Sequence, residues 1–325
     1  ANAKRYDKAF QTNAATAGRW KALLRDAHGK GLVRCLCPGT GERRLAVRYR
    51  SKKDSYHLSR YPKKGSEHAV SCQYHSQAPE NSGLGAYSKD VVVETSDGHL
   101  SLKLTISLRK KDPADVPASR VNAPSMSNGS VSMSAMTLGG LLHLLWTEAR
   151  LNEWSPGTKR WLGPVHARLL GAADRMVASG MRISNALVVA ASSPGNQADE
   201  NAKKVASAAR NKRRLIAIAP LAKHSEETEL VMSSQLKIAG FHGMPYLNMN
   251  ADLWTRIGKS YPLAMKAWRN GCTVVAIVQT DQPVIGKKSA SAEALNVALM
   301  IVSSQWIPVE SGYEWKIEKM LRGED

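Results

Sequence analysis

Three of the four cysteines of this chain lie between residues 35 and 72. Cys35 and Cys37 form a Cys-x-Cys pair, and His68 and Cys72 form a His-x-x-x-Cys pair farther along. Thiolate and imidazole groups in two closely spaced pairs are the usual ligands of a tetrahedral structural zinc site. The sequence therefore predicts a structural zinc ion held by these four side chains.

Two alternatives to this ligand set follow from the same stretch. His57 and His75 are competing fourth ligands, because both lie near the cysteines in the sequence. An arrangement without metal, with buried cysteines beside a packed histidine, would use the same residue types. The remaining cysteine, Cys272, opens the apolar run 273–278 and is expected to be a core residue.

The elements that must position these ligands can be predicted from residue spacing. His68 and Cys72 are four residues apart, so a short helix would present both on one face. With a turn carrying Cys35 and Cys37, this is typical of a treble-clef or zinc-ribbon-like module. Between the two pairs, residues 44–50 and 55–60 have the pattern of a strand hairpin.

Basic residues alternate with tyrosines along this hairpin, and two further lysines come shortly after it in the sequence. Such a face would bind phosphates and stack a few exposed bases. A second basic run lies in a predicted helix near residue 210. The candidate nucleic-acid contacts are Arg43, Arg44, Arg48, Tyr49, Arg50, Lys52, Lys53, Tyr56, Lys63, Lys64, Lys203, Lys204, Arg210, Lys212, Arg213 and Arg214.

The bulk charge indicates a polyanionic partner. The 325 residues include 46 Lys and Arg against 27 Asp and Glu, a formal net charge of +19. Nucleic acid, DNA or RNA, is the expected partner of a surface this positive. The sequence contains no apolar run of about 18 residues, which is the length that a membrane-spanning helix needs. The residues at the start lack the apolar core of a signal peptide, and the cysteine spacing suits a reducing compartment, so a cytoplasmic location is expected.

The rest of the chain predicts an α+β multidomain protein. Residues 1–112 are expected to form an N-terminal helix, over residues 7–29, and the basic zinc-binding β module. Residues 113–136 are rich in Pro, Ser and Asn and read as a linker. In residues 137–192, two helices precede a strand, an order also found in winged-helix modules.

Residues 193–325 are expected to form a C-terminal α+β domain. Its predicted helices lie at 195–214 and 251–270. Its predicted strands are 215–219, 229–232, 236–241, 272–279 and 294–303.

Several stretches resemble the bacterial domain of unknown function 1173 family. They are Arg34-Cys35-Leu36-Cys37, Tyr56-His57-Leu58-Ser59-Arg60-Tyr61-Pro62, Gly65-Ser66-Glu67-His68, Cys72-Gln73-Tyr74, residues 138–146 and residues 305–310. The family is carried largely on plasmids and integrated mobile elements. The resemblance therefore implies a setting in mobile DNA, and it implies no particular reaction.

No common catalytic motif is present: the sequence has no Walker-type phosphate loop, His-Glu-x-x-His or Gly-x-Ser-x-Gly. We expect a nucleic-acid-binding protein of a mobile element, with zinc supporting its basic surface, that can act as one subunit of a larger nucleoprotein complex. The alternative is a metal-dependent nuclease in the C-terminal domain, with Glu227 or Glu229, Asp252 and Asp281 as carboxylate candidates. An adaptor for an acidic protein partner would use the same charge.

Overall fold

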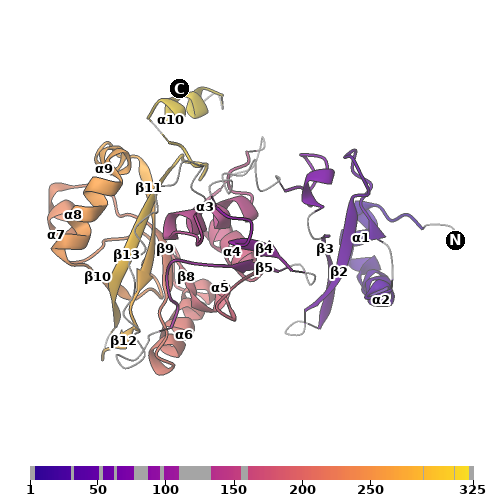
Figure 1. Ribbon diagram of the computed structural model, residues 1–325, viewed down its shortest axis with the longest axis horizontal. Coiled ribbons are helices and arrows are strands. Elements are labelled where there is room, and N and C mark those ends of the chain that lie inside the picture. Colours follow the sequence, from indigo (N-terminus) through magenta and orange to yellow (C-terminus); the bar gives the residue numbers. More distant parts are fainter. Residues whose placement is uncertain are drawn as a thin grey trace. The chain divides into compact units, whose positions relative to one another are not determined.

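The chain forms two compact units, unit 1 (Ala1–Ala86 and Val93–Leu100) and unit 2 (Tyr87–Val92 and Ser101–Asp325). Figure 1 shows the computed structural model coloured along the sequence. The structure describes residues 4–30, 33–50, 54–61, 64–76, 87–95, 99–109, 133–154, 160–287, 289–310 and 312–321.

Unit 1 opens with three short helical segments, α1 (Lys8–Thr12), the 3-10 helix η1 (Ala14–Thr16) and α2 (Ala17–Ala27). Asn13 separates the first two, because its backbone is extended and its side chain accepts a hydrogen bond from the Ala15 N–H at 2.9 Å. The single helix expected over residues 7–29 is thus interrupted.

A three-stranded antiparallel sheet follows, in the order β1 (Val33–Arg34), β2 (Arg44–Arg50) and β3 (Ser55–Arg60). Val47 pairs with Leu58 and Tyr49 with Tyr56, so the predicted hairpin is confirmed. Helix α2 packs against β2 and β3, with Leu24 buried. Burying apolar side chains from both elements is what holds the helix on the sheet.

The division between the units runs through the segment of β4 (Val92–Glu94) and β5 (Leu100–Leu102). These strands belong to a four-stranded sheet with β6 (Met176–Ala178) and β7 (Met181–Arg182). The linker predicted over residues 113–136 lies almost wholly outside the described residues.

Unit 2 is built on a six-stranded mixed sheet whose main path is β10-β13-β11-β9-β8, with β12 beside β13. Its outer pairs, β10 with β13 and β8 with β9, are parallel, and the central pairs are antiparallel. The strands are β8 (Leu187–Val189), β9 (Ile216–Pro220), β10 (Tyr246–Asn248), β11 (Thr273–Thr280), β12 (Val284–Ile285) and β13 (Ala290–Val302).

Helices cover both faces of this sheet (Figure 1). Helices α3 and α4 pack on one face, and α8 and α9 on the other. The second face holds a hydrophobic core, in which Trp268 is buried and donates from Nε1 to the Ala222 carbonyl at 2.8 Å. The helices of unit 2 are α3 (Leu138–Glu148), α4 (Leu162–Ala173), α5 (Ile183–Ala186), α6 (Asn196–Arg210), α7 (Glu226–Met232), α8 (Ala251–Ser260), α9 (Pro262–Arg269) and α10 (Gly312–Leu321).

Three predicted elements of unit 2 differ in the structure. The strand expected at 229–232 is part of helix α7, because Ser225 caps the helix by accepting from the Thr228 N–H at 3.0 Å and acidic residues occupy its first turn. The helix expected over 251–270 divides before Pro262, whose ring prevents a continuous helix. The strand expected at 236–241 forms only isolated bridges.

Strand β8 also bears on the predicted modules. It was expected to end a helix-helix-strand module over 137–192, yet it pairs with β9 in the main sheet. Residues on both sides of position 192 therefore share one sheet, and the winged-helix interpretation is not confirmed.

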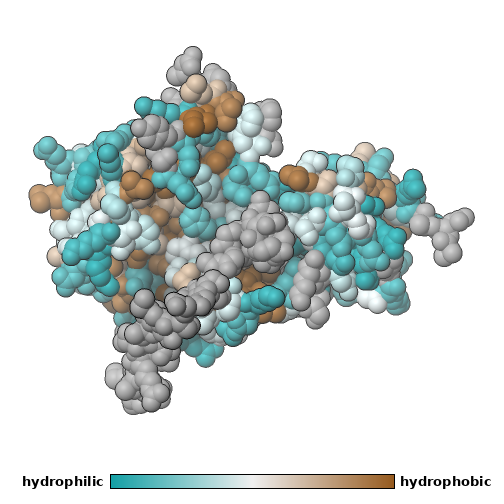
Figure 2. All heavy atoms as spheres, turned by 45° about the horizontal axis from the view of Figure 1, so that its top comes forward, coloured by the Kyte–Doolittle hydropathy of each residue, from teal (hydrophilic) through white to brown (hydrophobic). Residues whose placement is uncertain are grey.

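The surface shown in Figure 2 is mostly hydrophilic among the coloured residues, with separate brown patches. Exposed apolar side chains include those of Ile317, Met320 and Leu321 on α10. Within the described part of the chain, no helix combines the length and apolar character needed to cross a bilayer.

Candidate metal centre and basic surfaces

The first two candidate ligands lie in the loop that joins β1 to β2. Cys35 follows directly after β1, and Cys37 precedes Pro38 and Gly39. A Cβ atom added at Gly39 would lie 2.2 Å from the Glu67 carbonyl oxygen, so only glycine permits this close approach. The loop is thus pressed against the segment that carries the other two ligands.

Arg43 closes this loop from its far end. The Cys35 N–H donates to the Arg43 carbonyl at 2.9 Å, and the Arg43 side chain donates from Nη1 to the Gly39 carbonyl at 2.5 Å. The Arg43 N–H donates to Glu67 Oε2 at 3.0 Å, which links the loop to the second ligand segment. Arg43, predicted as a nucleic-acid contact, therefore braces the loop that carries Cys35 and Cys37.

His68 and Cys72 come from a 3-10 helix, η3 (Gly65–Glu67), and the turns after it. His68 ends the 3-10 helix, and the Cys72 N–H donates to the Ala69 carbonyl at 2.8 Å in the next turn. The expectation that one short α-helix presents both ligands is therefore wrong. Local turns, fixed by their own backbone hydrogen bonds, do the positioning.

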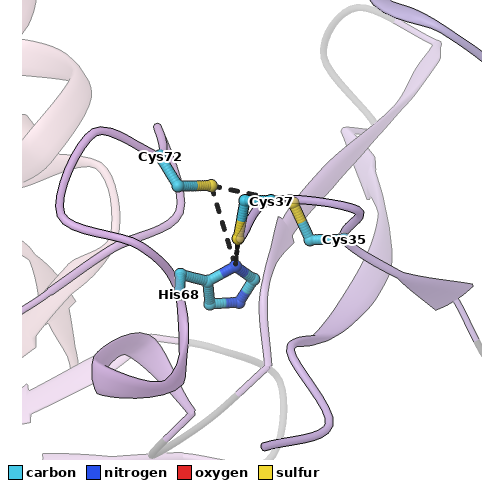
Figure 3. Close-up of side chains that lie close together, drawn as sticks. All are labelled: Cys35, Cys37, His68 and Cys72. Carbon is cyan, nitrogen blue, oxygen red and sulfur yellow. Dashed lines mark hydrogen bonds between the residues drawn. The ribbon is translucent and has the colours of Figure 1, made fainter. Parts of the chain in front are cut away.

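The four side chains converge on one point (Figure 3). Their ligand atoms all lie within 4.8 Å of one another, and among the described residues no other group of three or more His, Cys, Asp or Glu side chains is placed to hold an ion. Cys35 Sγ lies 3.7 Å from Cys72 Sγ, and His68 Nδ1 lies 3.6 Å from Cys37 Sγ and 3.7 Å from Cys72 Sγ. Cys35, Cys37, His68 and Cys72 can therefore bind a metal ion together.

The surroundings of these groups adjust their protonation. Burial acts to raise the pKa of Cys37, but the hydrogen bond from the Ala69 N–H and the neighbouring thiols bring that pKa below its ordinary value. Burial raises the pKa of Cys72 to about 12, against an opposing hydrogen bond from the Tyr74 N–H. Burial also lowers the pKa of His68. A bound cation would stabilise the thiolates and would require this neutral imidazole.

Neither competing ligand belongs to this group of four side chains. His57 is in β3, in register with Arg48, and His75 donates its backbone N–H to the Cys72 carbonyl at 2.9 Å. Cys272 lies directly before β11 in unit 2, where its half-buried side chain packs against the hydrophobic core.

Comparison with known proteins gives one match, to a protein family. A family model described as "Protein of unknown function (DUF1173)" matches residues 6–324, nearly the whole chain. The chain belongs to the DUF1173 family. No curated protein and no solved structure matches it.

In this DUF1173 member, the arginines and tyrosines of the hairpin lie on opposite faces of the unit 1 sheet. Arg48 and Tyr49 are successive residues of β2, and side chains alternate along a strand. Tyr49 pairs with Tyr56, whose ring meets that of His28 at the end of α2 at a centroid distance of 5.4 Å. The tyrosines therefore share the face that α2 covers.

The opposite face carries the arginines. The Arg44 guanidinium lies 4.4 Å from the centre of the Tyr61 ring, and Arg48 donates from Nε to Ser59 Oγ at 3.3 Å. Tyr61 was not among the predicted contacts. Arg60 pairs with Leu45, so Tyr61, the next residue, lies on the same face as Arg44. Strand alternation would therefore have identified Tyr61 as a candidate. We call Arg44, Arg48 and Tyr61 the unit 1 basic face.

The remaining candidates of unit 1 are less open to a partner or fall outside the described residues. Lys64 pairs with Glu67 at 2.5 Å, and this partner raises the pKa of Lys64. Lys52, Lys53, Lys63 and the side chain of Arg50 lie outside the described residues.

The second predicted basic run lies on α6 and just after it. Lys203 pairs with Glu200 at 2.8 Å, and Lys204 donates from Nζ to the Leu187 carbonyl at 2.9 Å. These two lysines therefore support the local structure. At the carboxyl end of the run, the side chains of Arg210, Lys212 and Arg213 are exposed.

The carboxylates considered for a nuclease do not meet. Glu229 accepts from Arg269 and lies 2.9 Å from His224 Nε2, whereas Asp281 pairs with Arg214 at 3.5 Å. Asp252 lies exposed in the first turn of α8, and Glu227 is exposed on α7. The partly buried carboxylates of Glu229 and Asp281 thus form ion pairs with arginines of unit 2.

Proposed function

We propose that this protein is a nucleic-acid-binding protein of a bacterial mobile element, in which a structural zinc ion at Cys35, Cys37, His68 and Cys72 supports the unit 1 basic face. The observation that carries the proposal is the convergence of four ligand atoms within 4.8 Å, at the loop from which the basic strand β2 begins.

Three of the distances between ligand atoms agree with tetrahedral coordination of zinc. With Zn–S bonds of about 2.3 Å and a Zn–N bond of about 2.0 Å, tetrahedral geometry separates ligand atoms by about 3.5 to 3.8 Å. The distance of 3.6 Å from His68 Nδ1 to Cys37 Sγ lies in this interval. So do the distances of 3.7 Å from Cys72 Sγ to His68 Nδ1 and to Cys35 Sγ. Three thiolates and one imidazole are also soft and borderline ligands that suit zinc.

A structural role for the ion follows from the ligand count. Four protein ligands complete a tetrahedron and leave no position for water or substrate. Cysteines that bind a metal must stay reduced, so the proposed site suits a reducing compartment such as the cytoplasm.

Charge supports nucleic acid as the partner. The chain carries a formal net charge of +19, and Arg44 and Arg48 share one face of the metal-supported sheet with Tyr61, whose side chain is 36% exposed. Guanidinium groups bind phosphates, and an exposed ring stacks a base. The mobile-element setting, which the resemblance to the DUF1173 family implies, is part of the proposal, and the protein would act there within a larger nucleoprotein complex.

The test combines metal analysis with binding. The purified protein is assayed for bound metals by mass spectrometry, and its affinity for single- and double-stranded DNA and RNA is measured by fluorescence anisotropy across a salt series. One zinc per chain and an affinity that falls steeply with salt are expected. Absence of stoichiometric zinc, or salt-independent binding, would contradict the proposal.

A cleavage assay with magnesium or manganese separates the nuclease alternative. No cleavage is expected. Cleavage that disappears in Asp252→Ala or Asp281→Ala would show an enzyme in place of a binding protein.

A further inference from the structure

A second group of cations lies in unit 2, at the carboxyl end of α6. Arg210 ends the helix, and Lys212 and Arg213 follow it with exposed side chains. Arg213 forms a backbone bridge with Arg109, and the Arg214 N–H donates to the Leu108 carbonyl at 3.1 Å. Arg109, which lies more than one hundred positions earlier in the sequence, is therefore part of the same surface.

The hairpin of β12 and β13 borders this cation group. Gln282 donates from Nε2 to the Ala209 carbonyl at 2.7 Å, which ties the start of the hairpin to the last turn of α6, and Figure 1 shows β12 beside α6. Val284 and Ile285 are 66% and 54% exposed. The Gly286 N–H donates to the Ser289 carbonyl at 2.8 Å and closes a tip whose sequence is Gly-Lys-Lys-Ser.

These cations differ from the paired ones nearby. No described residue forms an ion pair with Arg109, Arg210, Lys212, Arg213 or Lys287, whereas Arg214 pairs with Asp281 and Lys203 with Glu200. Cations at a helix carboxyl end stabilise the helix dipole, which accounts for Arg210 alone. Arg109 and Lys287 come from other segments, so a common anionic partner explains the group better.

We infer that this surface, here called the α6 patch (Arg109, Arg210, Lys212, Arg213, Val284, Ile285 and Lys287), binds the backbone of double-stranded DNA and places the β12–β13 hairpin against a groove. The inference rests on the proposed function and adds a second contact site, in unit 2. A two-stranded ribbon fits the major groove of B-form DNA, and that groove is too narrow in duplex RNA.

The chemistry of the α6 patch favours a duplex over a single strand. Its cations come from fixed backbone elements, as contacts to a regular phosphate row require. Its apolar members, Val284 and Ile285, are aliphatic, and the patch contains no aromatic ring of the kind that stacks unpaired bases.

The experiment compares two triple variants of the full chain that remove the same charge. R210Q/K212Q/R213Q neutralises the α6 patch, and R256Q/K259Q/K266Q neutralises three exposed cations on α8 and α9. Affinity for a 20-base-pair DNA duplex, the same length of single-stranded DNA, and heparin is measured across a salt series, with circular dichroism confirming that each variant is folded.

The patch triple is expected to bind the duplex at least ten-fold more weakly, with the log–log salt slope reduced by about 2 to 3, since each phosphate contact contributes roughly 0.9. The control triple is expected to lose less than about three-fold. Equal losses in both triples would show a bulk charge effect, and an unchanged patch triple would show that the surface is not used. Either result overturns the inference.

A further variant tests the hairpin without changing charge. V284S/I285S is expected to weaken duplex binding about three- to ten-fold while leaving heparin binding unchanged, because heparin has no groove. Equal binding of the duplex by this variant and the natural chain overturns the groove contact. Duplex binding that survives the patch triple but is lost in Cys37→Ser would overturn the α6 patch and leave the proposed function standing.

Discussion

Arg43 donates a hydrogen bond from Nη1 to the carbonyl oxygen of Gly39, 2.5 Å away, across the loop that carries Cys35 and Cys37. The same side chain donates from Nε to the Cys35 carbonyl at 3.4 Å. Arg43, which the sequence suggested for its charge, thus holds two backbone carbonyls of the loop that carries the first two candidate ligands.

Arg43→Ala is therefore expected to weaken metal retention. Loss of these hydrogen bonds removes about 1 to 3 kcal/mol from the metal-bound loop, so release of metal to a coloured chelator should become at least five-fold faster. Arg43→Lys keeps the charge and loses the forked donor. If Lys restored metal retention fully, the bracing role of Arg43 would be refuted, and Arg44→Ala should leave retention unchanged.

Removal of one ligand should abolish stoichiometric metal binding. Cys37→Ser or His68→Ala leaves three ligands, so we expect loss of bound zinc, local unfolding of residues 33–75 and at least a ten-fold loss of nucleic-acid affinity. Metal analysis, proteolysis and anisotropy measure the three effects. Cys272→Ser is the matched control, because Cys272 lies outside the ligand group. A variant that lost zinc and still bound normally would separate the metal from the binding surface.

The two faces of the unit 1 sheet predict opposite effects of neighbouring substitutions. R44Q/R48Q should weaken binding about ten-fold and reduce the log–log salt slope by about 2, because both arginines lie on the basic face. Tyr49→Ala should change affinity less than two-fold, since Tyr49 lies on the face that carries α2. A larger loss in Tyr49→Ala than in the arginine variant would place the nucleic acid on the other face.

The ion pair between Glu229 and Arg269 predicts a pH dependence of stability. The hydrogen bond from Arg269, with His224 second, holds the pKa of the Glu229 carboxyl below its usual value. The ionised Glu229 carboxylate therefore contributes fully to the free energy of unfolding above its unfolded pKa of about 4.3. This contribution is lost as the pH falls through the lower folded pKa.

Glu229→Gln should accordingly lower the free energy of unfolding by about 1 kcal/mol at pH 7. Urea unfolding at pH 7 and at successively lower pH should show the difference shrink below about pH 4. Glu227→Gln, an exposed carboxylate on the same helix, should cost only a few tenths of a kcal/mol. A cost of Glu229→Gln that grew with acidity would contradict the assignment.

Asn201 predicts a larger, pH-independent effect. It is fully buried on α6, where Nδ2 donates to the Val189 carbonyl at 2.7 Å and Oδ1 accepts from the Val189 N–H at 3.4 Å. Asn201→Ala leaves buried backbone groups of β8 unpaired and should cost about 2 to 3 kcal/mol in urea unfolding. Lys203→Ala, on the exposed side of the same helix, should cost less than about 1 kcal/mol.

Local spacing was enough to predict much of the fold. The β2–β3 hairpin, the strands β9, β11 and β13, and the helix α6 lie where alternation or helical periodicity placed them. Strand alternation and helical periodicity arise because one face of the element is buried, and both can be read from residues that are close together in the sequence. The prediction failed at α7 and at the His68–Cys72 turns, where capping and short-range backbone hydrogen bonds outweighed a brief apolar or four-residue pattern.

Sequence alone named the candidate ligands Cys35, Cys37, His68 and Cys72, because Cys-x-Cys and His-x-x-x-Cys pairs are recognised by residue type and spacing, but it left His57 and His75 as alternatives. The structure decided between them by bringing the first four ligand atoms within 4.8 Å of one another. Only the tertiary structure decided which cations remain open to a partner. Arg43 is engaged by Gly39 and Arg214 by Asp281, whereas Arg109 and Arg213 are brought together without an ion-pair partner among the described residues. Pairing and exposure of a charge depend on segments distant in the sequence, and their approach is set by packing of the whole unit.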